Sequence, residues 1–504
     1  MSETENLKSQ AFWGVVWSYV NKFGGQIIAI VPAMVLSRLL DPSEYGLIAM
    51  AGIFTGLAFQ LSDGGFVNAL IQKKNADHLD FCSIFYFNIV VSILLYILLY
   101  FLSPLCSSFL GKEELTDILR VSGLNLVFLS IGQVQGVIFK KTLQFKKITI
   151  RNMYVQLVSM IVSVVMAFTG FGVWALVYQG LIQTLGNSLL NIFMSTWKPT
   201  LCFSFNRVRL LFKYGSNILM SCLLGYGFSK VYDIIIGKFY LPSSLAVYNR
   251  SYTTAAIFKD TTVGVLGSVS FPVMSQIQDD NQRLRFNVRK FTKILTMLAS
   301  VVMSIAMVFA TPIFHFMYSS KWNAAIPLFQ VVCVSVVFYP IRALYEDLIS
   351  AKGRSDRFLY LSIADKFLTI LFVMLTWKMG LIYMIWGQTI TFFLVFLLLS
   401  HYIKDLIQYD FFQIVRDIAP YVLLAVVMCV CMWVIKWGLT LFVDYFVLGE
   451  MLSSFMIVFV GGLLSLSIYI YVLRTLKLRA YNDFIETLIR SVGEKRILYA
   501  MLSR

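Results

Sequence analysis

Long runs of apolar residues, separated by short polar connectors, make up most of the chain. A helix needs about 20 apolar residues to cross the roughly 30 Å hydrocarbon core of a bilayer. The runs are continuous rather than alternating, so they predict membrane-spanning helices and exclude a transmembrane β-barrel. We place fourteen such helices, at residues 12–37, 44–65, 81–102, 116–139, 149–169, 172–195, 213–237, 244–274, 290–312, 324–350, 358–377, 380–402, 418–436 and 451–473.

The composition agrees with an all-α polytopic membrane protein. Hydrophobic residues make up 59% of the 504 residues and charged residues 13%, with a mean hydropathy of +0.77. A soluble domain typically carries about 25% charged residues. The N-terminal segment MSETENLKSQ has neither a basic region nor a cleavage site, so we expect no removable signal peptide.

Basic residues are distributed unequally between alternate connectors. When the N-terminus is placed inside, most of the 42 Lys and Arg fall on the cytoplasmic side. This is the positive-inside pattern, and it predicts that both termini lie in the cytoplasm. It also accounts for much of the net charge of +16, so no nucleic-acid partner is expected. The connectors predicted to be external hold only Arg38, Lys112, Lys238, Lys321, Lys378 and Lys436.

Two short segments that lie 200 residues apart are similar. LSRLLDPSEYGL at 36–47 and IGKFYLPSSLAV at 236–247 align Pro42 with Pro242. Because six helices is an even number, two six-helix copies would insert with the same polarity, as parallel repeats with the substrate site between them. The predicted parts are an N-lobe of helices 1–6 (1–195), a cytoplasmic loop (196–212), a C-lobe of helices 7–12 (213–402), two further helices (403–473) and an amphipathic cytoplasmic tail (474–504).

Several basic residues lie inside the predicted helices, where a charge at the helix centre costs roughly 2.5–3.5 kcal/mol. Such cations must face protein or a water-filled cavity, so they predict a cavity that binds an anion. Lys22 is the strongest candidate, because its own helix has no acidic residue within a turn of it. Arg120 lies near a helix end and is expected to reach the interface instead. The candidate substrate-binding residues are Lys22, Lys230, Arg250, Lys259, Arg342 and Lys366.

Four intramembrane carboxylates accompany these cations. Asp233 and Glu346 stand three and four residues from a candidate cation, so each can pair with it on one helix face. Asp260 and Asp365 directly adjoin lysines, and because adjacent residues diverge on a helix, we expect them to find partners elsewhere. The four could instead bind Na⁺ or H⁺ in an antiport cycle; charge pairing is the favoured interpretation.

The sequence gives no sign of a cofactor. Its seven cysteines show neither disulfide nor metal-ligand spacing, and small apolar packing is the favoured role. No nucleotide-binding motif is visible, so we expect no ATP hydrolysis by this chain.

Three segments resemble the polysaccharide transporter family. They are SRLLDPSEYGL, LSDGGFVNALIQK at 61–73 and TWKPTLCFSFNRVRLLFKYGSNIL at 196–219. They are similar to the family's Arg-Leu-Leu-x-Pro-x-x-Tyr-Gly turn, to its Trp-Lys-Pro central loop and to its Lys-Tyr-Gly at the seventh helix. The family belongs to the multidrug/oligosaccharidyl-lipid/polysaccharide exporter superfamily, and the details resemble Wzx-like bacterial flippases.

This resemblance implies a function. It implies two six-helix lobes around a central cavity that opens alternately to each side of the bacterial inner membrane. The implied substrate is an oligosaccharide linked to undecaprenyl diphosphate, moved to the outer leaflet for surface polysaccharide biosynthesis. Arg250 and Arg342 are then the candidates for direct diphosphate contacts, since arginine binds phosphate through two parallel hydrogen bonds. The expected partners are the lipid-linked oligosaccharide, membrane lipids and the polymerase machinery, and a monomer is expected.

Two other functions stay open at this point. A multidrug exporter of the same fold needs acidic residues in its first lobe, and helices 1–6 offer only Asp63, near a helix end. A membrane glycan polymerase or ligase needs a large external catalytic loop, but the longest external connectors are 103–115 and 437–450. The three histidines, His78, His315 and His401, form no catalytic cluster in the sequence. Both functions are therefore disfavoured.

Overall fold

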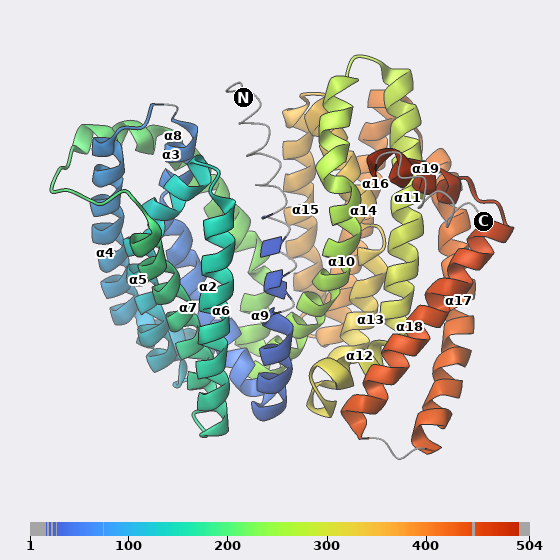
Figure 1. The fold of residues 1–504 in the computed structure, drawn as a ribbon, viewed down its shortest axis with the longest axis horizontal. Helices are drawn as coiled ribbons and strands as arrows, with labels where there is room; N and C mark the ends of the chain where they lie inside the picture. Colours follow the sequence, from blue (N-terminus) through green and yellow to red (C-terminus); the bar gives the residue numbers. More distant parts are fainter. Residues whose placement is uncertain are drawn as a thin grey trace. The chain divides into compact units, whose positions relative to one another are not determined.

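The computed structural model describes residues 17, 20–21, 24–26, 28–73, 75–445 and 449–492 (Figure 1). Within these ranges all regular secondary structure is helical, as predicted. Among the described helices, ten are long and apolar enough to cross a membrane, or eleven if the bent pair Ile218–Ser229 and Val231–Phe239 forms one span. The chain is therefore a multi-pass helical membrane protein.

Three of the fourteen predicted spans fall outside that set, and their residues explain why. The first predicted span corresponds to Gly24–Leu39, a shorter apolar helix that runs over residues outside the described ranges. The helix Val173–Met194 carries Gln179, Gln183, Asn187 and Asn191, and Pro242–Gln276 carries charged and hydroxyl-bearing residues throughout. Polar side chains of this kind lower the mean hydropathy of a helix. They are tolerated where the helix faces protein or water rather than lipid.

The chain folds into two compact units, Met1–Val247 and Tyr248–Arg504. In the first unit, α5 packs against both α4 and α7, and α6 packs against α7. A small core forms where α3, α4, α5 and α8 meet, around Phe66, Ile84 and Val134. The elements are the helix Gly24–Leu39, α2 (Pro42–Asp63), α3 (Phe66–Gln72), α4 (His78–Leu110), α5 (Leu115–Lys141), α6 (Phe145–Phe168), α7 (Val173–Met194), α8 (Phe205–Ser229) and α9 (Val231–Phe239).

The second unit has a larger continuous core. α11 packs against α17, and α15 packs against α16. Buried residues such as Tyr345, Phe396 and Tyr409 belong to one cluster that reaches from α11 to the start of α19. The elements are α10 (Pro242–Gln276), which begins in the first unit, α11 (Asn281–Val308), α12 (Ala310–Met317), η1 (Ser320–Trp322), α13 (Ala325–Val336), α14 (Tyr339–Ala351), α15 (Ser355–Thr376), α16 (Leu381–Ile407), α17 (Phe411–Tyr445), α18 (Glu450–Thr475) and α19 (Arg479–Val492).

The two similar sequence segments adopt the same local structure. Pro42 and Pro242 each occupy the first position of a helix. A backbone N–H at this position would have no acceptor within the helix, so proline loses no hydrogen bond there. The two turns also contact each other inside the first unit, because a side chain at Gly46 would overlap the backbone of Pro242. This contact explains why glycine follows the first proline turn. The lobe boundaries and the parallel repeat stay predictions.

One connector residue was placed wrongly. Lys436 was expected in an external connector, but α17 continues to Tyr445 and Lys436 lies inside it. Its Nζ donates to the carbonyl oxygen of Val308 at 3.1 Å. In a continuous helix that oxygen would accept from the N–H of residue 312, which is proline and has none. Lys436 therefore supplies the donor missing at the break between α11 and α12.

The tail forms the predicted helix, α19, in its described part. Ala480 is fully buried, and its backbone N–H donates to the Tyr421 hydroxyl at 3.2 Å. Phe484 packs against the core of the second unit. The side chains of Leu488, Ile489 and Val492, further apolar residues of this helix, lie outside the described set.

Candidate functional site

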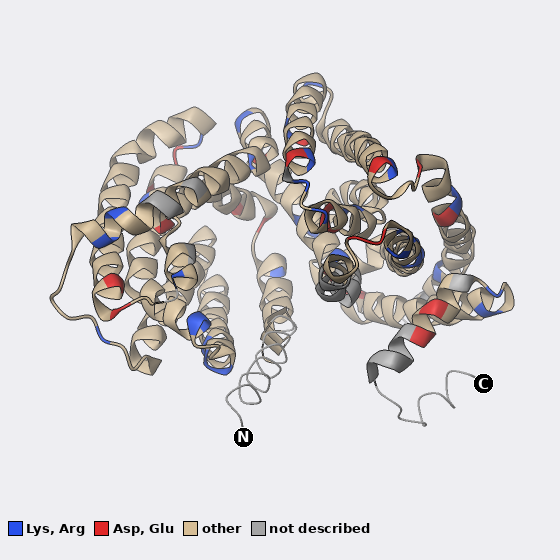
Figure 2. Cartoon of the chain, turned by 90° about the horizontal axis from the view of Figure 1, so that it is seen from above, with Lys and Arg blue, Asp and Glu red and all other residues tan. Residues whose placement is uncertain are grey.

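The candidate cations lie in both units. Lys22, the strongest candidate from sequence, falls outside the described residues. Lys230 belongs to the first unit, and the other four belong to the second. Figure 2 shows acidic and basic residues along the helices of each unit, and many of the described cations have a carboxylate neighbour.

Lys230 stands at the joint between α8 and α9, where the chain bends by 41°. Its Nζ contacts the Asp233 carboxylate at 2.6 Å and lies 5.9 Å from the centre of the Tyr226 ring. The Tyr226 hydroxyl in turn donates to the Gly52 carbonyl of α2 at 2.6 Å. The pairing of Lys230 with Asp233 agrees with the three-residue spacing.

Arg342 is the centre of a charge network between α14 and α15. Its Nε contacts Glu346 at 2.8 Å, and its Nη1 contacts Asp365 at 3.5 Å. Asp365 also contacts Lys366 at 3.2 Å. As expected, Asp365 has a partner elsewhere, Arg342. Its contact with the adjacent Lys366 was not expected, and it forms because the lysine side chain is long enough to fold back to its neighbour.

Lys259 of α10 reaches the same part of α14. Its Nζ lies 4.4 Å above the Tyr339 ring and 3.9 Å from the neighbouring carboxylate of Asp260. We call Lys259, Asp260, Arg342, Glu346, Asp365 and Lys366 the charge cluster. It contains three cations and three carboxylates, so each cation is oriented by an acid, and an arriving phosphate would compete with that acid.

Arg250 occupies a different environment. Its guanidinium carbon lies 4.6 Å from the Tyr318 ring centre and 4.7 Å from that of Trp322, and both rings are buried. Such cation–π contacts stabilise by roughly 0.5–2 kcal/mol. Arg250 therefore fastens α10 to the segment after α12. Its predicted phosphate contact has no support in this geometry and stays a prediction.

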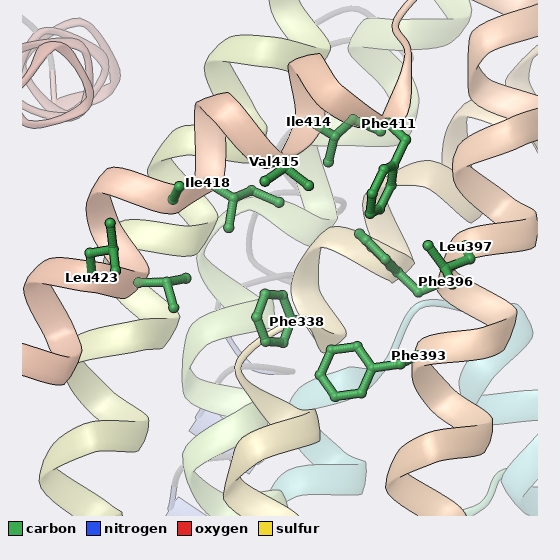
Figure 3. A pocket seen from close by; sticks show the side chains of 11 residues that line it. Phe338, Phe393, Phe396, Leu397, Phe411, Ile414, Val415, Ile418 and Leu423 are labelled. Carbon is green, nitrogen blue, oxygen red and sulfur yellow. The ribbon is translucent and has the colours of Figure 1, made fainter.

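An apolar pocket of about 410 Å³ is lined by residues from the start of α14, from α16 and from α17 (Figure 3). Phe338, at the break between α13 and α14, directly precedes Tyr339, the ring that Lys259 of the charge cluster contacts. The centre of the Phe338 ring lies 5.3 Å from that of Phe393 in α16. Phe392, the next residue back, lies under Arg342 at 5.5 Å. An apolar chain suits this pocket, which is lined by Phe338, Phe393, Phe396, Leu397, Phe411, Ile414, Val415, Ile418, Ala419, Val422 and Leu423.

Sequence reasoning missed a charged junction in the first unit. Asp80, in the first turn of α4, is fully buried and contacts Lys73 at 2.5 Å and Arg207 at 3.5 Å. The preceding Asp77 caps α4, and the backbone N–H of Asp80 lowers the pKa of the Asp77 carboxyl. Because these partners are distant in sequence, only the acid at a helix start could have pointed to the junction.

The same region brings together His78, Cys82 and Cys202, which the sequence spacing had not indicated. The Trp197 indole N–H donates to Nδ1 of His78 at 2.9 Å, so the neutral ring carries its proton on Nε2. That N–H faces the Thr200 hydroxyl at 2.8 Å. A metal ion on Nε2 would need the proton on Nδ1, against the indole donor, so the arrangement fits a hydrogen-bonded cluster better than a metal site.

Two of the segments that carried the family resemblance meet in space. Gly65 has a positive φ of 73°, and a side chain there would overlap the backbone of Gly215. Gly65 belongs to LSDGG and Gly215 to the Lys-Tyr-Gly segment at the seventh predicted helix. The two motifs therefore include the two sides of one close backbone contact between α3 and α8.

Comparison with known proteins gives consistent matches. The model of the family described as polysaccharide biosynthesis protein matches residues 35–327. The lipopolysaccharide biosynthesis protein WzxC of Escherichia coli (strain K12) is 24% identical over 357 residues, covering 70% of this chain and 72% of WzxC. The teichuronic acid biosynthesis protein TuaB of Bacillus subtilis (strain 168) is 24% identical over 361 residues, covering 70% of this chain and 74% of TuaB.

Solved structures support the fold. The lipid II flippase MurJ, in an inward closed conformation, matches with a TM-score of 0.70 at 15% identity, covering 91% of this chain and 99% of MurJ. An inward-facing multidrug resistance transporter of the MATE family matches with a TM-score of 0.56 at 16% identity, covering 78% of this chain and 98% of that transporter. The chain thus has the fold that these two solved structures share. With more than half of its length matched by the family model, the chain belongs to the polysaccharide biosynthesis protein family.

Proposed function

We propose that this chain is a transporter that moves an oligosaccharide linked to undecaprenyl diphosphate from the inner to the outer leaflet of the bacterial cytoplasmic membrane. The observation that carries the proposal is that the charge cluster and the apolar pocket use neighbouring residues at the start of α14 and in α16. Arg342 and Phe338 lie within one helical turn of each other, and both pack on the phenylalanines of α16. An anionic head and an apolar tail would each find a complementary surface there.

The comparisons support the transport class. Relatives include a succinoglycan biosynthesis transport protein of Rhizobium meliloti (strain 1021), and the structural neighbours are a flippase and a multidrug transporter. Transport by this chain would therefore serve the biosynthesis of a surface polysaccharide. The proteins that polymerise the glycan are the expected functional partners.

The proposed architecture contains fourteen helices. Two six-helix lobes, related as parallel repeats, would enclose a central cavity that opens alternately to each side, with two further helices at the C-terminal end. Both termini would lie in the cytoplasm, and the protein would act as a monomer. The similar proline turns, in which Pro42 and Pro242 each begin a helix, support the repeat.

We further propose that Asp233, Asp260, Glu346 and Asp365 act mainly as partners of the cations. Three of them lie within 3.5 Å of a candidate cation, and Asp260 lies within 3.9 Å of one. The second role that these carboxylates allow is binding of Na⁺ or H⁺ during the transport cycle. No other cofactor is part of the proposal.

A complementation assay tests the proposed function. The wild type, Lys22→Ala, Arg342→Gln and Arg120→Gln are each expressed in a strain that lacks its own flippase, and surface glycan and internal lipid-linked glycan are measured. Arg120 is the matched control, because it also contacts an acid, Asp117 at 3.5 Å, and an aromatic ring, Tyr100 at 4.7 Å.

We expect the wild type and Arg120→Gln to restore surface glycan, and Arg342→Gln and Lys22→Ala to accumulate the lipid-linked precursor. The double variant Arg342→Gln/Asp365→Asn separates charge pairing from substrate binding. If it restores transport, Arg342 serves only to balance Asp365. If the wild type restores no glycan but exports cationic dyes, the multidrug alternative replaces the proposal.

A further inference from the structure

A polar cavity of about 460 Å³ lies within the first unit, remote in sequence from the charge cluster. It is formed by the helix Gly24–Leu39 and the residues just before it, together with α6 and α7. Among the described residues its lining has no charged side chain. Six carboxamides line it: Asn21, Gln26, Asn152, Gln156, Gln183 and Asn187.

Neighbouring groups hold several of these amides in place. The Asn152 amide donates to the Asn21 side-chain oxygen at 3.2 Å, and the Gln156 amide donates to the Gly25 carbonyl at 3.0 Å. Arg151 donates to the Asn152 oxygen from two nitrogens, at 2.6 and 3.1 Å. The amides are therefore oriented before any ligand arrives.

One acceptor is left over. The Asn187 amide donates to the Gln183 carbonyl at 2.8 Å, but its Oδ1 is buried and has no hydrogen-bond partner within the described part of the chain. A buried polar atom without a partner costs roughly 1–3 kcal/mol, so a ligand donor at this point would be stabilising. Asn187, which lines the cavity, thus keeps an acceptor that the described part of the first unit does not use.

We propose that this cavity binds sugar rings of the transported glycan through their hydroxyl and acetamido groups. Each carboxamide supplies two N–H donors and an acceptor oxygen, and each sugar hydroxyl can donate one hydrogen bond and accept others, so the two kinds of group are complementary. Within the described part of the chain, the lining offers no cation for a phosphate and no carboxylate for an organic cation. Its volume lies in the range of small-molecule sites, about 300–1,000 Å³. The inference rests on the proposed function and deepens it, because it assigns the sugars of the substrate to this cavity of the first unit.

The position of the cavity along the helices fits this role. Asn152 and Gln156 lie in the first half of α6, whereas Gln183 lies at the middle of the antiparallel α7 and Asn187 in its second half. In the predicted orientation Asn152, Gln156 and Asn187 lie in the cytoplasmic half of the membrane, and Gln183 lies near its middle. A head group assembled in the cytoplasm would meet these amides on entry.

The test compares two lipids that differ only in the sugar. The full-length protein is placed in nanodiscs, and its dissociation constants are measured for undecaprenyl diphosphate and for the same lipid carrying one N-acetylglucosamine. The variants are Asn187→Leu and Gln183→Leu. Asn125→Leu is the matched control, since Asn125 also donates within its own helix and also has a buried, unpartnered Oδ1, but does not line the cavity.

We expect the wild type to bind the glycosylated lipid more tightly than the sugar-free lipid. In each cavity variant the ratio of the two dissociation constants should fall about tenfold, the effect expected from the loss of one buried hydrogen bond. Affinity for the sugar-free lipid should not change, and Asn125→Leu should behave as the wild type. A preference that survives in both cavity variants, or equal weakening for both lipids, overturns this inference alone. A wild type that binds neither lipid overturns the proposed function as well.

Discussion

Asp80 shows how a fully buried carboxylate can be tolerated in the first unit. Its two cationic contacts, Lys73 and Arg207, come from the end of α3 and from α8, so one side chain joins three helices. Removing one member of a buried ion pair leaves an uncompensated charge and costs about 3–5 kcal/mol, much more than losing an exposed pair.

Asp80→Ala should therefore lower the apparent melting temperature of the purified protein by several degrees. The control is Asp117→Ala, because Asp117 is 71% exposed and pairs with Arg120 at the surface. We expect its change in the free energy of unfolding to be at most about 1 kcal/mol. Thermal unfolding followed by tryptophan fluorescence measures both, and equal shifts would argue against a structural role for the buried pair.

Local spacing decided which charge pairs could be predicted from the sequence. The pairs Lys230–Asp233 and Arg342–Glu346 follow from residues three and four apart on one helix. The contact of Asp417 with Lys293 joins α17 to α11, and no spacing rule reaches across that distance. The amides of the polar cavity were missed for a related reason. Uncharged polar residues on separate helices do not indicate a shared site in the sequence, because only the packing of the helices brings them together.

The break between α11 and α12 shows how one element depends on another. Pro312 leaves the Val308 carbonyl without its helical donor, and Lys436 of α17 replaces that donor. Lys436→Met should lower the free energy of unfolding by about 1.5–3 kcal/mol, the usual contribution of a hydrogen bond to a charged group.

In a Pro312→Ala background, residue 312 regains its N–H, so the same Lys436→Met change should have a smaller effect. Thermal unfolding of the four proteins of this double-mutant cycle gives the coupling between the two positions. If Lys436→Met is equally destabilising in both backgrounds, the lysine does not act through the break.

The contact between the two proline turns predicts opposite effects for two glycines in α2. Gly46→Ala would place a methyl group against the Pro242 backbone and should destabilise by about 1–3 kcal/mol. Gly52 has open space around its Cα, so Gly52→Ala should stabilise the helix by up to about 1 kcal/mol. Thermal unfolding of the two variants distinguishes them, and a stabilising Gly46→Ala would rule out the close contact.

At the scale of the whole molecule, the positive-inside pattern makes a prediction that labelling can check. Arg354 and Lys378 are both exposed and stand at opposite ends of α15. With the seven native cysteines replaced by serine, Lys378→Cys should react with a membrane-impermeant maleimide in intact cells, whereas Arg354→Cys should react only after permeabilisation. The reverse result would invert the proposed topology.

Hydropathy predicted the fold class and most helices of the whole molecule, because apolar length is a local property of the sequence. Helix ends were less predictable. Hydropathy treats a lysine as the end of an apolar helix. α17 nevertheless extends past Lys436, because that lysine has a hydrogen-bond partner inside the protein. The two compact units depend on packing between distant helices. The expectation of two lobes came from the short internal repeat and from the resemblance to a family, not from hydropathy.

The balance of the charge cluster has a consequence for energetics across the membrane. Its three cations and three carboxylates cancel, so movement of the unloaded cluster through the membrane field would carry no net charge. A bound diphosphate would then be the principal charge displaced. An inside-negative potential drives an anion outward by about 2.3 kcal/mol per charge for each 100 mV. The membrane potential could thus favour the export step over the return step.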